Sequence, residues 1–547
     1  MNERLEQSVS VALLVLAAAC GVGFAAAWPP GGEPGEVALK AWLAGAVILL
    51  LVAVRLGPLR RRPRLAAAVL ALCAVAGVWA HTNFGRFHFP VFAHYWEQFH
   101  YQLGARYFPE LGYDGLYLAS IAAERRIAPE RPAQRKVRDL RTNRVRLYEK
   151  LEDHAAEVRG RFAPPSWRAF VNDNRHFVRA IRPADLQAMR RDHGYNPTPA
   201  WTFVAQQVQG GERFTAKTLR RLGAVDALLL AAAFVVLFRT YGFRTGCLCL
   251  VIFGLGYAGR FKWIGGAFLR FDWLAALILA ACALRQGRGL GAGLALGYAT
   301  AVRLFPVVFL LGPAVAALAA WRRGERPVWP ARLLLGFGLA LLLAFAAGSL
   351  AGRGVGAWSE FAQRMQLYQL SVARNSVGLE WLALYGGETL ARAAEAQEGD
   401  AAWPLQREQV AARKQDRALF LRGLQAVFLL LVVVAVWRAP PDVALVASMA
   451  ALFAVTLSAG YYWSLLALAP LAVRWPGVLV LLLVNAAMYL VHEAVPDKLV
   501  RYGLLSWGML AVFLSWLVPE ALRVGRGALP GWASSQPEPA DAGQQQA

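Results

Sequence analysis

Long apolar runs, separated by short polar or basic stretches, dominate the hydrophobic pattern of this 547-residue chain. Several runs approach the ~20 residues that a helix needs to cross ~30 Å of hydrocarbon. They do not alternate between apolar and polar positions, which excludes the strands of an outer-membrane barrel. The pattern therefore predicts an all-α polytopic integral membrane protein with about 12–14 transmembrane helices.

The order of apolar and polar stretches predicts six parts. Three spans come first, and a large polar insertion separates them from a central group of spans. A second polar loop, a C-terminal group of spans and a disordered tail rich in Gln, Pro, Ala and Ser follow. In order, these parts are residues 1–80, 81–221, 222–350, 351–418, 419–520 and 521–547.

One apolar run in the central group is interrupted. The run from Leu290 to Ala320 predicts two short helices, with Arg303 to Pro306 as the turn between them. Each half has ~15 residues and is ~22 Å long, so Arg303 is expected at or below the outer interface. A charge inside a membrane is a functional-site hypothesis by default. The alternative is that Arg303 only extends its side chain towards the interface.

The large insertion contains an amphipathic segment and a turn. Trp167, Phe170, Phe177 and neighbouring apolar residues recur at helical spacing, which predicts a helix that could lie on the membrane surface. Gly194 and two prolines in 192–199 indicate a turn before another helix begins near Trp201.

The formal net charge of +23 changes the prediction of orientation but not of class. Arginines cluster at the ends of apolar runs, as in 60–64, which is the positive-inside pattern. This places both termini in the cytoplasm and the insertion outside, in the inner membrane of a bacterium with a GC-rich genome. No nucleic-acid-binding motif accompanies the charge, so we expect no nucleic-acid partner.

Several kinds of chemistry are not supported. The five cysteines all lie within apolar runs, so no disulfide framework is predicted. No Walker loop, nucleotide fingerprint, HExxH motif or nucleophile elbow occurs in a credible context. His94, Glu97 and His100 do not share one helix face cleanly, so we expect no metal there and no cofactor.

The remaining polar groups cluster at the outer ends of the predicted spans. A carboxylate with several cations at a membrane surface suits transfer from a lipid-phosphate donor, with the carboxylate as base and the cations on the departing phosphate. The candidate catalytic residues are Glu97, Asp114 and Asp272, and the candidate substrate-binding residues are His100, Arg106, Lys262, Arg270, Arg303, Asn375 and Tyr462.

Three short motifs resemble those of one enzyme family. Residues Ala301 to Pro306 resemble the Lys/Arg-x-x-Pro element of the polyprenol-phosphate-mannose-dependent mannosyltransferases of glycosyltransferase family 87. Asn375 and Ser376 resemble their Asn-x-Ser element, and Ser458 to Trp463 resembles their late Tyr-Trp element. The chain departs from the family in its longer first loop, its two additional N-terminal spans and a Glu at the place of the usual Asp.

This resemblance implies a GT-C-like membrane glycosyltransferase. It would move a mannose-like hexose from a polyprenyl-phosphate donor to a periplasmic or lipid-linked glycan acceptor, with inversion at the anomeric carbon. Glu97 would be the general base. Arg303, Lys262 and Arg270 would bind the donor phosphate, and Asn375 and Tyr462 would contact the sugar or the acceptor.

Other interpretations stay open. Glu97 could be a salt-bridged loop residue, Asp272 could form a structural ion pair with Arg270, and 461–463 could belong to an aromatic belt. The whole chain could instead be a secondary transporter or flippase for a lipid-linked anion, or a membrane scaffold.

Overall fold

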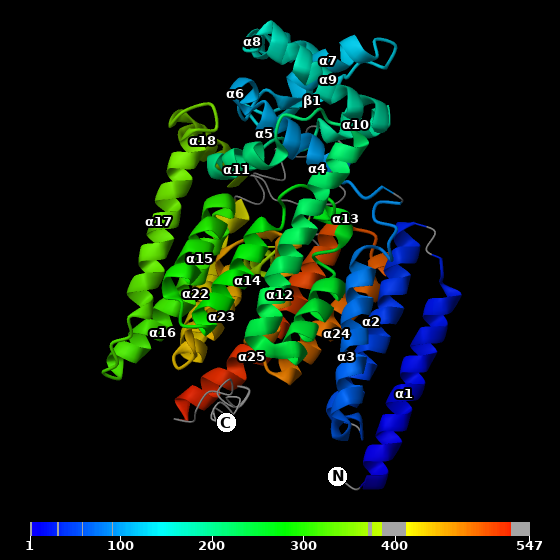
Figure 1. The fold of residues 1–547 in the computed structure, drawn as a ribbon, viewed down its shortest axis with the longest axis vertical. Helices are drawn as coiled ribbons and strands as arrows, with labels where there is room; N and C mark the ends of the chain where they lie inside the picture. Colours follow the sequence, from blue (N-terminus) through cyan, green and yellow to red (C-terminus); the bar gives the residue numbers. More distant parts are fainter. Residues whose placement is uncertain are drawn as a thin grey trace, which may run out of the picture.

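A computed structural model describes residues 3–29, 32–56, 58–89, 91–369, 375–384 and 412–526. Long helices stand side by side, and a compact cap built from the large insertion covers one end of them (Figure 1). Residues 370–374 and 385–411 of the predicted second polar loop and most of the predicted C-terminal tail lie outside the described residues.

Eight described stretches are long and apolar enough to cross a membrane, so this is a multi-pass membrane protein. Their bounds are α2 (Glu33–Leu56), α3 (Pro63–His81), α12 (Ala216–Leu255), η4 with α16 (Phe305–Leu310 and Leu311–Arg322), α17 (Trp329–Ser349), α22 (Ala418–Val436), α24 (Trp475–Ala494) and α25 (Lys498–Gly525). Further apolar elements complete the bundle: α1 (Glu3–Ala26), α14 (Asp272–Arg285), α15 (Gly289–Arg303), α23 (Pro441–Val455) and the 3-10 helix η5 (Gly460–Leu471).

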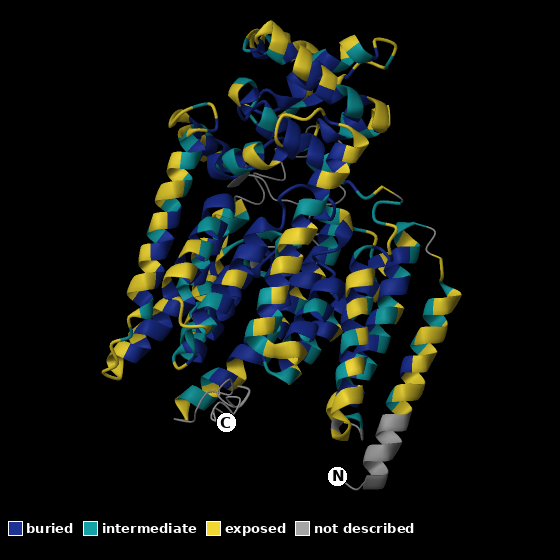
Figure 2. Ribbon diagram, viewed as in Figure 1, coloured by how far each residue is buried: buried dark blue, intermediate teal, exposed yellow. Residues whose placement is uncertain are grey.

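Side chains are more buried on the central helices of the bundle than on the peripheral ones. The central helix α23 is buried along most of its length, whereas Leu335 and Leu342 on the peripheral helix α17 are 65% and 70% exposed (Figure 2). Large apolar side chains that face outward on long helices fit a lipid surface rather than water. The predicted all-α membrane class is confirmed, and the total of about 12–14 spans stays a prediction.

The helix α12 is a hairpin. At Gly242 the backbone leaves helical geometry, with φ 80° and ψ 168°. The rings of Phe234 and Phe253 lie 5.9 Å apart, whereas a straight helix would separate these positions by roughly 28 Å. The chain therefore crosses the bundle twice here.

The predicted broken pair is present. Helix α15 ends at Arg303, Leu304 takes a left-handed conformation with φ 52°, and the chain continues through η4 into α16. Glycines fix the position of α15, because a Cβ on Gly293 would come within 2.0 Å of the Leu333 carbonyl oxygen on α17. Such close backbone approach is typical of helix pairs in membranes.

The cap is mainly helical. It contains α4 (Tyr95–Gln98), the π-helical turn η2 (Phe99–Leu103), α5 (Gly104–Arg106), α6 (Phe108–Leu111), α7 (Leu116–Ile127), η3 (Tyr148–Leu151), α8 (Glu152–Gly160), α9 (Pro164–Ala180), α10 (Pro183–Met189), α11 (Pro199–Gln209) and one antiparallel strand pair, β1 (Lys136–Asp139) with β2 (Arg144–Leu147).

The amphipathic helix of the insertion packs within the cap. Trp167, Phe170 and Phe177 on α9 are buried, and the Asn174 amide donates to the Ser120 carbonyl on α7 at 3.2 Å. The proposal that this helix lies on the membrane surface is therefore wrong, because its apolar face is already covered by the cap. Helical spacing alone cannot tell a membrane from a protein neighbour.

Candidate active site

Two oppositely charged side chains meet where the cap joins the bundle. Glu97 lies on α4, and Arg270 lies in the loop between α13 (Phe261–Ile264) and α14. Nε of Arg270 is 2.9 Å from Oε2 of Glu97, and the side chains are 2% and 16% exposed, respectively. The His94 ring begins α4 by accepting a hydrogen bond from the Glu97 backbone N–H. The pair is thus almost withdrawn from water.

Aromatic groups hold the Arg270 guanidinium in place. It lies 4.1 Å from the centroid of the Tyr101 ring and 5.3 Å from that of Tyr461, and its Nη2 donates to the Tyr461 hydroxyl at 3.2 Å. The backbone is fixed too, since the Asp226 carboxylate accepts from the N–H groups of Arg270 and Phe271 at 2.7 and 3.1 Å. Arg270 therefore has one defined orientation.

Arg303 lies close to the same loop. Its Nη2 donates to the Leu269 carbonyl and its Nη1 to the Val302 carbonyl, both at 3.0 Å. The Trp201 indole also donates to the Leu269 carbonyl, at 2.9 Å, and the Arg303 guanidinium lies 5.6 Å from the Trp201 ring centroid. Arg303 therefore binds the turn that carries Arg270.

The predicted Asn-Ser and late aromatic motifs lie side by side. Strand β3 (Ser376–Val377) pairs antiparallel with β4 (Ser458–Ala459), and the Gly460 N–H donates to the Asn375 carbonyl at 2.6 Å. The Tyr462 ring lies 4.6 Å from that of Tyr461 and 4.8 Å from that of Phe305, which follows Arg303 closely. The motif segments and the Glu97–Arg270 pair therefore form one neighbourhood, which we call the junction site.

Asp272 lies next to the junction site but does not pair with Arg270. Its Oδ2 accepts from the Tyr298 hydroxyl at 3.1 Å, and its buried Oδ1 has no hydrogen-bond partner in the described part of the chain. Arg270 instead forms its ion pair with Glu97. The alternative of an Asp272–Arg270 pair is therefore not what the structure contains.

The surroundings of Glu97 tune its acidity. Burial raises the pKa of the Glu97 carboxyl, and the positive charge of Arg270 opposes that rise without cancelling it. A general base works best when its pKa approaches the working pH. A partly buried carboxylate with a raised pKa is a candidate for a functional site.

Four other candidates lie in networks of their own. Asp114 accepts from Arg161 at 2.8 Å and from Arg141 at 3.0 Å in the outer cap. Arg106 donates to Asp173 at 2.9 Å and to the Glu212 carbonyl. These contacts tie the cap together, so neither residue reaches the junction site.

His100 and Lys262 are also committed elsewhere. The His100 ring bonds the Trp96 carbonyl through Nδ1 and the Tyr117 hydroxyl through Nε2, both at 2.8 Å. Both ring nitrogens are therefore used inside the cap. Lys262 forms an ion pair with Glu33 at the start of α2, away from Arg270.

The sequence interpretation did not assign roles to Tyr101, Tyr461 or Asp226. Asp226 had a usable signal, because it is a lone carboxylate inside an apolar run, and such residues are functional or structural anchors. No sequence signal separates Tyr461 from Tyr462, and only the fold shows which hydroxyl meets Arg270.

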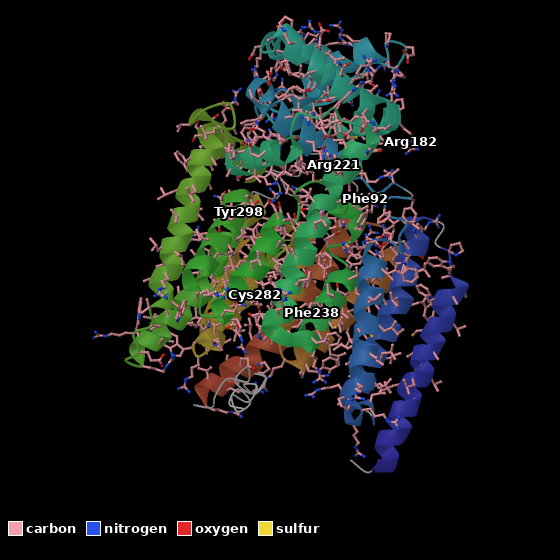
Figure 3. The ribbon with its side chains drawn as sticks, in the orientation of Figure 1. Phe92, Arg182, Arg221, Phe238, Cys282 and Tyr298 are labelled. Atoms are coloured by element: carbon pink, nitrogen blue, oxygen red, sulfur yellow. The ribbon has the colours of Figure 1, made fainter. Side chains whose placement is uncertain are left out.

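An open groove of about 610 Å³ leads away from the site between α12, α14 and α15. Asp272 and Tyr298 line one end, Gln286 and Arg288 line the other, and mainly apolar side chains such as Leu279 lie between. Figure 3 shows Tyr298 nearer the cap and Cys282 nearer the opposite end. Because α14 has 14 residues, the groove follows roughly 21 Å of helix.

Across the described ranges, no group of three or more His, Cys, Asp or Glu side chains could hold a metal ion. Comparisons with protein-family models, with curated proteins and with solved structures find no match.

Proposed function

We propose that this protein is a membrane glycosyltransferase of the GT-C type. It moves a hexose, mannose-like by the motif resemblance, from a polyprenyl-phosphate donor to a glycan or glycolipid acceptor. The observation that carries the proposal is the buried Glu97–Arg270 pair, 2.9 Å between Oε2 and Nε, at the junction of cap and bundle. One base and one phosphate-binding cation are what this transfer needs.

The reaction is a single displacement. The Glu97 carboxylate takes the proton from an acceptor hydroxyl while that oxygen attacks the anomeric carbon of the donor sugar. The bond from that carbon to the phosphate oxygen breaks, and polyprenyl phosphate leaves with the bonding electrons. Arg270 and Arg303 stabilise the charge that develops on the phosphate. A second carboxylate is not required, because the phosphate is already a good leaving group.

Arg270 has two roles in this scheme. It holds the Glu97 carboxylate in one orientation, and its own orientation is fixed by Tyr101, Tyr461 and the backbone contacts of Asp226. Preorganised charges contribute more to catalysis than mobile ones, because they cost no reorganisation during the reaction.

The groove beside Asp272 and Tyr298 suits the donor's chain. It is open along its length and lined mainly by apolar side chains, and it ends beside the polar junction site. An isoprenoid chain in the groove would bring its phosphate to the end where Arg303 and Arg270 lie. Residues of the groove thus bind the lipid, and the junction site binds the sugar phosphate.

The orientation and location follow from the same proposal. The cap and the junction site would face the periplasm of a bacterial inner membrane, with both termini in the cytoplasm, as the arginine clusters favour.

The experiment is a transfer assay in proteoliposomes. Wild-type protein is supplied with radiolabelled polyprenyl-phosphate-mannose or polyprenyl-phosphate-glucose and a lipid-linked glycan acceptor. The proposal expects labelled product that depends on protein and acceptor. Movement of intact donor across the bilayer without product would favour a flippase, and neither product nor movement would favour a scaffold.

A further inference from the structure

A second cluster of charged side chains lies at the cap end of the bundle, apart from the junction site. It is formed by residues from the start of α2, the turn before α13, the end of α24 and the start of α25. Its members are Glu33, Glu36, Lys40, Arg260, Lys262, His492 and Arg501, with the aromatic rings of Tyr257, Tyr489 and Tyr502 around them.

Arg260 is the central residue of this cluster. Its side chain is 2% exposed, and Nη2 lies 3.7 Å from Oε1 of Glu33, which is longer than a hydrogen bond. Its guanidinium lies 4.9 Å from the centroid of the Tyr257 ring. The buried Nε and Nη1 atoms have no hydrogen-bond partner among the described residues. Buried guanidinium groups are normally satisfied, so these donors mark a place for an acceptor.

The buried Tyr489 hydroxyl is a second donor of this cluster. The Tyr489 ring is 5.3 Å from that of Tyr257, and its hydroxyl has no hydrogen-bond partner in the described part of the chain. The Tyr257 hydroxyl, by contrast, is bonded to Nδ1 of His492 at 2.8 Å. Arg260 and Tyr489, which both lie against the Tyr257 ring, therefore still offer donors.

The charges of the cluster favour a negative ligand. The cluster contains more cations than carboxylates. The cations are Lys40, Arg260, Lys262 and Arg501, and the carboxylates are Glu33 and Glu36. Lys40 donates to Glu36 and to Asn83, the latter at 2.7 Å. Lys262 is 44% exposed and gives the cluster an accessible edge. An excess of positive charge with unused N–H donors is suited to an oxyanion.

We propose that the Arg260 cluster is a second anion-binding site, which takes a phosphate group at the membrane surface. Nε and Nη1 of Arg260 and the Tyr489 hydroxyl donate to phosphate oxygens, and Lys262 adds charge at the entrance. The group could belong to a phospholipid head group or to free phosphate. The site lies where the turn before α13 meets α2, α24 and α25, and its existence does not depend on the proposed transfer reaction.

The test is equilibrium binding to the intact protein in nanodiscs. One arm adds radiolabelled inorganic phosphate to nanodiscs of a phosphate-free galactolipid, and the other compares retention of phosphatidylglycerol with that of the galactolipid by native mass spectrometry. Saturable binding in either arm supports the site. Phosphatidylglycerol binding alone identifies a lipid head group, and phosphate binding alone identifies the free ion.

Variants connect the binding to this cluster. Arg260→Gln is expected to weaken binding about tenfold or more, because charged hydrogen bonds are lost. The Tyr489 hydroxyl has no hydrogen-bond partner among the described residues, so Tyr489→Phe breaks no contact that the structure describes. This variant is expected to weaken binding about threefold. This variant keeps the test decisive if Arg260→Gln does not fold. Arg221→Gln is the control, since Arg221 is 58% exposed and paired with Glu212.

Two results would overturn the proposal. The first is the absence of saturable binding of phosphate and of any preference for phosphatidylglycerol in the wild type. The second is binding that Tyr489→Phe and a folded Arg260→Gln variant leave equal to that of Arg221→Gln.

Discussion

Nε of Arg270 lies 2.9 Å from Oε2 of Glu97, although the two residues come from different parts of the chain. Glu97 belongs to the cap, and Arg270 belongs to the loop that enters the bundle at α14. The contact between the two charges therefore also connects the cap to the bundle. Function in our account depends on this junction.

The first prediction concerns the shape of the Arg270 side chain. Arg270→Lys keeps the charge but cannot contact Glu97 and the Tyr461 hydroxyl in one fixed plane. The loss of a charged hydrogen bond, about 1.5–3 kcal/mol, corresponds to a transfer rate about 10- to 160-fold lower. Single-turnover transfer measures it, with Arg221→Lys as the matched exposed control. Equal rates for the two variants would show that Arg270 has no role in transfer.

The second prediction is the pH dependence of transfer. Because burial raises the pKa of Glu97, the base becomes protonated at a higher pH than an ordinary glutamate, whose pKa is about 4.3. The rate should therefore fall, as pH is lowered, before pH reaches about 4.3. A pH–rate profile with saturating donor measures this. A rate that stays flat down to that pH is incompatible with Glu97 as the base.

The third prediction is that Asp114 stabilises the cap and takes no part in catalysis. Burial would raise the pKa of the Asp114 carboxyl, but hydrogen bonds from His154 and Arg161 hold it well below its usual range. A depressed pKa gives stability that is present above about pH 4 and lost as pH falls through the lowered value. Asp114→Asn should destabilise the cap by about 1.5–3 kcal/mol and leave the transfer rate unchanged.

Hydrogen exchange of α7 and α8 reports cap stability in that variant. Asp185→Asn is the control, because its partner Arg182 is 84% exposed and such surface pairs contribute about 0–1 kcal/mol. If Asp114→Asn instead abolished transfer in a stable protein, the base would lie in the outer cap.

The sequence predicted those parts of the fold that depend on local pattern. Apolar runs of sufficient length became helices, and the break after Arg303 was visible because Arg and Pro interrupt an apolar run. The glycine contacts of α15 with α17 were not predicted, since a glycine's use becomes clear only when a second backbone is known to approach it.

The candidate site was predictable only in part. Counting the spans was enough to predict that Glu97, Arg270 and Arg303 lie on one side of the membrane. It could not predict which group each charged side chain pairs with. Lys262 pairs with Glu33 on α2, because the fold brings that helix start next to α13. The pairing of β3 with β4 brings together segments far apart in the chain, which no local pattern specifies.

The most direct test of the central claim is the Glu97→Gln variant in the proteoliposome assay, with donor binding measured on the same preparation. Gln keeps the size of the side chain but cannot accept the proton, so we predict transfer about 10²- to 10⁴-fold slower with donor affinity largely retained. Transfer at the wild-type rate by Glu97→Gln would contradict the account.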